Sequence, residues 1–149
     1  MVDDLRLEVC SDPRLLGVVR GVLRSWMEVF DLVKDRRDEV VLAVDEAVAN
    51  AMRHAYEGRR DQSVDLVLSS SDDSIEITVS DQGLPCPAEC VDRRPMARPE
   101  PHELRPGGLG VRLIHQVFDD VLFCAGEDRG NCVTMRMRRT EKHGVGRED

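Results

Sequence analysis

The chain has 149 residues, of which 41% are hydrophobic and 34% charged, and its formal net charge is −8. These values suit one globular domain and argue against extensive disorder. The acidic balance disfavours direct binding of DNA or RNA, which usually needs a basic surface. No apolar run approaches the ~20 residues of a membrane span and the N-terminus lacks the apolar core of a signal peptide, so we expect a cytoplasmic protein that binds no membrane.

Alternating and helical patterns predict the first half of the fold. Residues 5–9 alternate between apolar and polar side chains and predict a short first strand. Ser11-Asp12-Pro13 is typical of a helix start, and apolar residues at helical spacing follow it to about residue 30. A second helix is expected from about residue 35 to residue 56, with Gly58 ending it.

A hairpin and a proline-rich segment come next. The strand patterns at residues 64–68 and 75–79 are separated by turn-forming residues, which predicts a hairpin. Residues 84–106 contain six of the seven prolines, so neither a long helix nor a central strand is expected there. A loop of this length inside a domain is usually a functional lid or a disordered segment, and we predict a lid.

The last third predicts one helix and two strands. The helix begins at the glycines of residues 107–110, and the strands cover about 121–124 and 133–137. Residues 1–138 then form one domain, and residues 139–149 are expected to be a disordered tail. Antiparallel strand pairs with separate helices predict an α+β two-layer sandwich, in which the helices cover one face of a mixed, mainly antiparallel sheet.

Five cysteines, an odd number, in a chain without an export signal are expected to be reduced thiols. Cys86 and Cys90 are four residues apart and His102 follows, which leaves a zinc site as the less favoured alternative. Zinc needs more thiolates or imidazoles at close spacing than this segment supplies.

The second helix carries a narrow polar stripe. At helical spacing the stripe comprises Glu39, Glu46, Asn50, Arg53 and Glu57, with His54 beside it. A solvated face is the simpler interpretation of such a stripe. However, asparagine is a poor helix former in mid-helix, and a carboxylate, an amide and a base stacked one turn apart suit a metal–phosphate group.

Two glycine motifs follow the helix. Asp81-Gln82-Gly83 comes directly after a strand. It is either a common turn or a ligand site, in which the Asp81 carboxylate accepts a hydrogen bond from an amino group and Gly83 lets a flat ligand come close. Gly107-Gly108-Leu109-Gly110 opens a helix, whose first N–H groups favour anions such as phosphate. The glycine motif matches neither the Walker nor the Rossmann pattern.

In this order, the three motifs resemble those of the Bergerat-fold (GHKL) ATPases. The segments EAVANAMRHAY and RPGGLGVRLIHQVFDDV are most similar to the bacterial anti-sigma-factor serine-protein kinases. The resemblance covers about residues 5–138. It implies the histidine-kinase-like ATPase fold with ATP and Mg²⁺ as cofactors.

The resemblance also implies roles for the residues of the helix stripe. Glu46 matches the general base of the family, and Asn50 matches the Mg²⁺ ligand that bridges to the phosphates. Arg53 and His54 occupy positions that lie near the phosphates in relatives, and the resemblance does not decide between them. Arg105 stands at the end of the lid, where relatives often carry an arginine that reaches the γ-phosphate or a partner protein.

The two glycine motifs acquire roles in the same way. Asp81 matches the aspartate that accepts a hydrogen bond from the adenine amino group, and Gly83 matches the glycine beneath the adenine. Gly108 and Gly110 match the glycines of the phosphate loop. One position departs from the pattern, because Asn131 stands where relatives usually carry a threonine in the water network around adenine.

The implied function is that of an anti-sigma factor and serine-protein kinase. Such a protein binds a sigma factor and phosphorylates a small antagonist protein on serine; a homodimer is a further partner to consider. An alternative is an ATP-binding switch module that regulates partners without kinase activity, and a third interpretation is an ATPase acting by hydrolysis. The presence of Glu46 favours the kinase, since a pure binding module needs no base.

Overall fold

The computed structural model describes residues 1–30, 32–86 and 108–139. In chain order the elements are β1 (Val2–Cys10), a 3-10 turn (Pro13–Leu15), α1 (Leu16–Met27), α2 (Lys34–Asn50), a π-helical turn (Ala51–Ala55), β2 (Ser63–Ser70), β3 (Ser74–Asp81), α3 (Gly108–Val117), β4 (Asp120–Ala125) and β5 (Asn131–Arg138). Each helix and strand expected from the sequence within the described ranges is therefore confirmed. The predicted lid from residue 87 onward and the tail from residue 140 lie outside these ranges.

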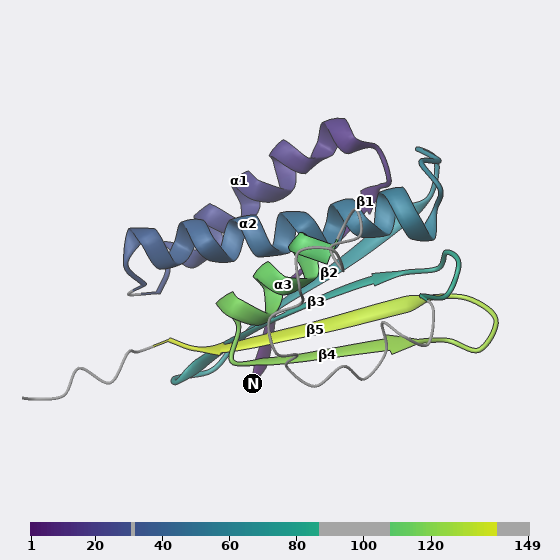
Figure 1. Cartoon of the computed structure of the whole chain (residues 1–149). Coiled ribbons are helices and arrows are strands. Elements are labelled where there is room, and N and C mark those ends of the chain that lie inside the picture. Colours follow the sequence, from purple (N-terminus) through teal and green to yellow (C-terminus); the bar gives the residue numbers. More distant parts are fainter. Residues whose placement is uncertain (31, 87–107, 140–149) are drawn as a thin grey trace, which may run out of the picture.

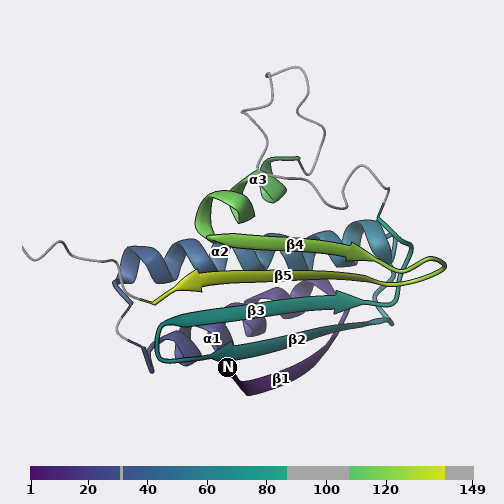
Figure 2. The ribbon, with the colours of Figure 1, turned by 90° about the horizontal axis from the view of Figure 1, so that it is seen from below.

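The strands form one sheet in the order β1-β2-β3-β5-β4 (Figure 2). All four pairings are antiparallel. The expected sheet was mixed, but the described part contains no parallel pair. The physical reason is that β3 and β4, which run in the same direction, are separated by β5.

The helices cover one face of this sheet (Figure 1). The alternation in β2 and β3 places Leu66, Leu68, Ile75 and Ile77 on the covered face, where none of them is exposed to solvent. Full burial of such a side chain contributes about 1.5–3 kcal/mol. The core between sheet and helices therefore holds α2 against β3, the strand that leads to the Asp81 motif.

Local signals at the helix ends behave as the sequence predicts. The Asp12 carboxylate accepts a hydrogen bond from the Arg14 N–H at 3.0 Å and caps the 3-10 turn before α1. At the other end of the helical layer, Gly58 has a φ of 80° and its N–H donates to the Met52 carbonyl at 3.0 Å. Gly58 thus ends the second helix, because the left-handed conformation is accessible to glycine at little cost.

Arg139 lies at the boundary predicted between domain and tail. Its N–H donates to the Asp73 carbonyl at 2.8 Å, and its guanidinium lies 4.5 Å from the centre of the Phe30 ring. Residue 139 is therefore packed on the domain. None of the helices within the described ranges is long and apolar enough to cross a membrane.

Candidate functional site

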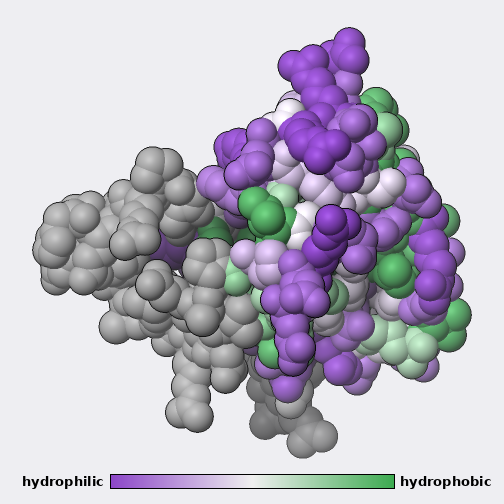
Figure 3. Space-filling view, turned by 90° about the vertical axis from the view of Figure 1, so that its right-hand side faces the viewer, coloured by the Kyte–Doolittle hydropathy of each residue, from purple (hydrophilic) through white to green (hydrophobic). Residues whose placement is uncertain are grey.

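The three sequence motifs converge around the C-terminal half of α2. Figure 1 shows α2 ending on the side of the molecule where β3 ends and β5 begins, and α3 lying beside α2. Figure 3 looks onto this end of the molecule, where hydrophilic side chains prevail and hydrophobic ones are scattered among them. Among the residues of these elements, Arg53 and His54 are exposed and Glu46 and Asn50 are partly exposed.

Arg53 brings the stripe residues together. One Nη of Arg53 donates to Oδ1 of Asn50 at 3.1 Å and lies 3.7 Å from Oε2 of Glu46. These contacts are partly exposed, so the ion pair adds little stability and serves mainly to orient the side chains. The structure thus confirms that a carboxylate, an amide and a base stand together on one helix face.

The rest of the predicted stripe does not join this cluster. Glu39 is exposed and lies 3.4 Å from Arg36, near the start of α2. His54 is exposed and makes no ion pair or hydrogen bond with the described residues, and Glu57 sits beyond the helix end with a φ of 52°. Of the two basic candidates, Arg53 is the one that contacts both Glu46 and Asn50.

The sequence did not predict the π-helical turn that follows Asn50. In this turn the Tyr56 N–H donates to the Ala51 carbonyl, five residues earlier, at 3.1 Å. Such turns are frequent at functional sites. The last carbonyl groups of a helix lack hydrogen-bond partners within the helix. The Ala55 carbonyl is one of them, and it accepts a hydrogen bond from the Leu84 N–H at 2.8 Å. The helix end is thereby joined to the segment that follows β3.

Asp81 is a buried carboxylate at the end of β3, only 5% exposed. Its Oδ1 accepts hydrogen bonds from the Gly83 N–H at 2.9 Å and from Nδ2 of Asn131 at 3.0 Å. Burial raises the pKa of Asp81, and these two hydrogen bonds oppose that rise. A backbone hydrogen bond from Asn131 lowers the pKa of the same carboxylate further. Both side-chain contacts with measured distances are made by Oδ1, which leaves Oδ2 as the candidate acceptor for a ligand.

Gly83 is required by packing. A Cβ added there would lie 2.6 Å from the carbonyl carbon of Ala55 and 2.8 Å from its Cβ, closer than real Cβ atoms approach. Because one neighbour is backbone, rotation of a side chain cannot relieve the collision. The Asp81 motif can therefore dock on the helix end only with glycine at position 83.

Gly110 lies between α3 and α2, where its neighbour is the flexible side chain of Glu46 and not backbone. A Cβ at this position would collide with Oε2 of Glu46 and lie 3.1 Å from Cδ of the same side chain. The absence of that Cβ lets the first turn of α3, which begins at Gly108, approach the Glu46 carboxylate. Arg105 and Gly107 lie outside the described residues.

Tyr56, the only tyrosine of the chain, is a structural residue that sequence reasoning missed. Its hydroxyl donates to the Ser63 carbonyl and accepts a hydrogen bond from the Gln82 N–H at 2.8 Å. Burial raises the pKa of Tyr56. The side chain thus joins the helix end to the start of β2 and to the Asp81 motif. The available signal was a single aromatic residue at the end of the polar stripe.

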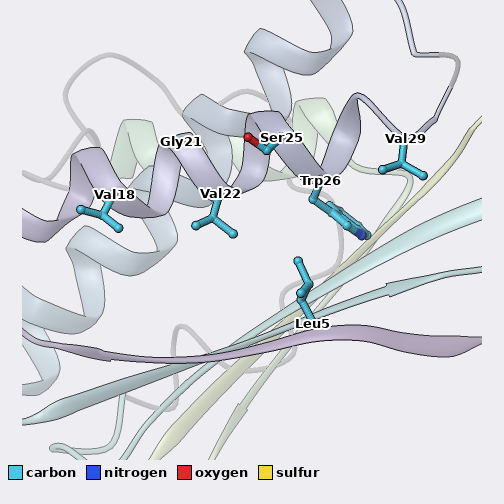
Figure 4. Close-up of a pocket in the computed structure, with 7 residues that line it drawn as sticks. All are labelled: Leu5, Val18, Gly21, Val22, Ser25, Trp26 and Val29. Carbon is cyan, nitrogen blue, oxygen red and sulfur yellow. The ribbon is translucent and has the colours of Figure 1, made fainter.

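A separate open groove of about 720 Å³ lies between α1 and β1 (Figure 4). Its lining is mainly apolar and consists of Leu5, Val18, Gly21, Val22, Ser25, Trp26 and Val29. None of the residues singled out by the motifs lines it. Of the residues of the zinc alternative, Cys90 and His102 lie outside the described part of the chain, so that alternative stays untested. Within the described part, no group of three or more His, Cys, Asp or Glu side chains could hold a metal.

Comparison with known proteins agrees with this arrangement. Residues 9–137 match the family of histidine kinase-like ATPase domains. The serine-protein kinase RsbW of Oceanobacillus iheyensis is 30% identical over 122 residues, which are 80% of this chain and 77% of that protein. An anti-sigma F factor of the same organism is 27% identical over 145 residues, which are 97% of this chain and 99% of that protein.

Solved structures share the fold at low sequence identity. The crystal structure of the RsbU and RsbW domains of Rv1364c from Mycobacterium tuberculosis matches 90% of this chain and 31% of its own, with a TM-score of 0.64 and 17% identity. The histidine kinase domain of the blue-light-activated kinase EL346 from Erythrobacter litoralis matches 85% of this chain and 60% of its own, with a TM-score of 0.55 and 21% identity. The chain therefore belongs to the family of histidine kinase-like ATPase domains, together with the serine-protein kinase RsbW and the anti-sigma F factors.

Proposed function

We propose that this chain is an anti-sigma factor and serine-protein kinase, which binds Mg-ATP, sequesters a sigma factor and phosphorylates a small antagonist protein on serine. Relatives named serine-protein kinase RsbW and anti-sigma F factor support this function. The structural observation that carries it is the contact between Gly110 and Glu46, since it sets the proposed phosphate loop against the proposed base.

Adenine binds at the Asp81 motif in this proposal. Oδ2 of Asp81 accepts a hydrogen bond from the adenine amino group while Oδ1 remains engaged by the protein. Gly83 forms the floor beneath the base, where its close approach to Ala55 leaves no room for a side chain. The buried carboxylate favours adenine over guanine, which would present a carbonyl oxygen in place of the amino group.

The phosphates bind where α3 begins. The first N–H groups of a helix lack partners within it and attract anions, and Gly108 and Gly110 allow phosphate to approach them closely. Arg53 adds a positive charge on the α2 side, with His54 beside it and Arg105 at the end of the lid as further candidates. Gly110 brings the start of α3 close to the Glu46 carboxylate, so the proposed phosphate-binding N–H groups and the proposed base lie at the same place in the fold.

Asn50 is the residue that would hold Mg²⁺. Its Oδ1 is a neutral hard oxygen, the kind of ligand that Mg²⁺ takes together with waters and phosphates. When bound, Mg²⁺ supplies charge neutralisation at the phosphates. Arg53, which donates to the same oxygen, is exposed enough to turn toward the phosphates instead.

Glu46 acts as the general base. Its carboxylate accepts the proton of the substrate serine as the hydroxyl oxygen attacks the γ-phosphorus, the bond from that phosphorus to the β–γ bridging oxygen breaks, and ADP leaves. The contact with Arg53 keeps the carboxylate in place. Phosphorylation of the antagonist releases it, so that the sigma factor stays captured. A homodimer and a cytoplasmic location belong to the same proposal.

Phosphoryl transfer tests the proposal. Proteins captured by this chain from its host, with and without ATP, supply the antagonist, and transfer of labelled γ-phosphate is then measured. Glu46→Gln should leave Mg-ATP binding nearly intact and slow transfer by about 10²–10⁴-fold. Glu39→Gln is the matched control, because Glu39 lies on the same helix and contacts only Arg36 among the described residues.

Asn50→Ala should behave differently and weaken Mg-ATP binding itself, because the metal loses its protein ligand. If Glu46→Gln transfers phosphate at the wild-type rate, Glu46 is not the base. If the wild type binds ATP and a partner yet transfers no phosphate, the chain is the nucleotide-gated switch module and the kinase proposal is wrong.

A further inference from the structure

Asn131 joins the end of the sheet to the Asp81 motif. It is the first residue of β5 and stands directly opposite Asp81, the last residue of β3, in the strand register. The preceding Gly130 has a φ of 90°, and its N–H donates to the Gly83 carbonyl at 2.9 Å. The start of β5 therefore lies tightly against the proposed adenine site.

All the hydrogen-bonding groups of the Asn131 carboxamide are engaged. Nδ2 donates to Oδ1 of Asp81 at 3.0 Å and to the Leu84 carbonyl at 2.8 Å, while Oδ1 accepts a hydrogen bond from the Cys86 N–H at 2.6 Å. A threonine, with one hydroxyl hydrogen, cannot donate to both acceptors. The two donor hydrogens of the Asn131 amide are therefore both needed for these contacts.

These contacts determine the orientation of the amide. The Leu84 carbonyl needs a donor and the Cys86 N–H needs an acceptor, so the amide cannot flip without losing both hydrogen bonds. In the required orientation the NH₂ group faces Oδ1 of Asp81. A flipped amide would present its oxygen to the carboxylate, which is repulsive.

We propose that Asn131 is a positioning residue for nucleotide recognition. It holds one oxygen of Asp81 so that the other is presented to the adenine amino group, and it hydrogen-bonds the backbone of Leu84 and Cys86 directly after the Asp81 motif. This inference rests on the proposed function, because it assumes that Asp81 binds adenine. Asn131 itself does not touch the nucleotide; it acts through Asp81.

Substitution of Asn131 tests the inference by calorimetric titration of Mg-ATP and Mg-GTP. Asn131→Ala should weaken ATP binding roughly ten- to a hundredfold, the usual worth of a hydrogen bond to a charged group, and change GTP binding much less. Thr134→Ala is the matched control. Thr134 lies three residues along β5 and its hydroxyl contacts that of Thr78, so its loss should leave both affinities unchanged.

The pH dependence of ATP binding separates positioning from mere stability. The hydrogen bond from Asn131 counteracts the rise in the pKa of Asp81 caused by burial, so Asn131→Ala should raise that pKa further. ATP affinity should then decline at a higher pH on acidification than in the wild type. Two other titratable groups lie in this region. Tyr56 faces Asp81 from the helix end and stays neutral between about pH 4 and 8. Asp65 of β2 lies near Tyr56.

Asn131→Asp provides the sharpest variant because it is nearly isosteric. It keeps an acceptor for the Cys86 N–H but sets a second carboxylate beside Asp81, and two such groups share a proton readily. ATP binding by this variant should be weak at neutral pH and recover partly on mild acidification, opposite to the wild-type trend.

The outcomes are distinguishable. If the wild type binds no Mg-ATP, the proposed function and this inference fail together. If the wild type binds but Asn131→Ala binds ATP with unchanged affinity and an unchanged pH profile, only this inference is wrong. If Asn131→Ala is less stable yet keeps the wild-type pH profile and the wild-type preference for ATP over GTP, Asn131 is a structural residue and the inference is likewise overturned.

Discussion

Replacement of Gly83 by alanine should destabilise the protein by about 2–4 kcal/mol, because the new Cβ has no space. The collision is with the carbonyl carbon and Cβ of Ala55, at 2.6 and 2.8 Å, so the segment after β3 must move away from the helix end. Overpacking of this kind costs about 1–3 kcal/mol.

The movement also strains two backbone hydrogen bonds. Leu84 donates to Ala55 at 2.8 Å and Gly130 donates to Gly83 at 2.9 Å, and each such bond contributes about 0.5–1.5 kcal/mol. A gain of about 0.4–1 kcal/mol from the reduced freedom of the unfolded chain offsets part of the loss. Mg-ATP affinity should fall as well, since Asp81 moves with the segment.

Equilibrium unfolding in urea measures the change in stability as a shift of the midpoint urea concentration, provided that the dependence of the unfolding free energy on urea concentration keeps the same slope. Gly21→Ala is the control: Gly21 lies in α1 and an added Cβ meets nothing within 4 Å. The same substitution should there stabilise the protein by roughly 0.5–1 kcal/mol, since alanine is the better helix former. If the midpoint urea concentration of Gly83→Ala equals or exceeds that of the wild type, residues 81–84 do not pack on the helix end as described.

Three further predictions concern titratable side chains. Burial lowers the pKa of His115 in α3, so the contribution of this residue to stability is present above about pH 6.5 and is lost as the pH falls through the lower folded-state pKa. Thermal unfolding of His115→Gln, measured over the same pH range, should lack that loss. Unfolding temperatures that change with pH in parallel for variant and wild type would contradict the prediction. Hydrogen bonds from Arg14 lower the pKa of Asp12 from its ordinary value of 3.8 to about 2. Asp12→Asn should therefore be less stable than the wild type at neutral pH, and acid-unfolding curves should show this difference vanish as the pH falls from 3.8 toward 2. Asp81→Asn should keep the fold, because a neutral amide is easier to bury than a carboxylate, and should weaken Mg-ATP binding in calorimetric titration; wild-type affinity would place adenine elsewhere.

The order of helices and strands follows from local sequence patterns. Alternation at residues 64–68 and 75–79 predicted the β2–β3 hairpin, and helical spacing predicted α2 together with the shared face of Glu46, Asn50 and Arg53. Gly58 predicted where the helix ends. These features depend on residues within a turn or two of each other, so periodicity and propensity suffice to predict them.

The interior of the site depended instead on segments that are distant in the chain. Asn131 meets Asp81 across 50 residues only because the register of β3 and β5 sets them opposite each other. Gly83 and Gly110 were recognised as motif glycines, but only the packing against the Ala55 backbone explains why position 83 has no room for a Cβ, and only the structure shows Gly110 facing the Glu46 carboxylate. Local patterns in the chain were enough to predict the elements and the residue types of the site. Which atoms meet depends on strand register and helix packing, because these are cooperative properties of the whole domain.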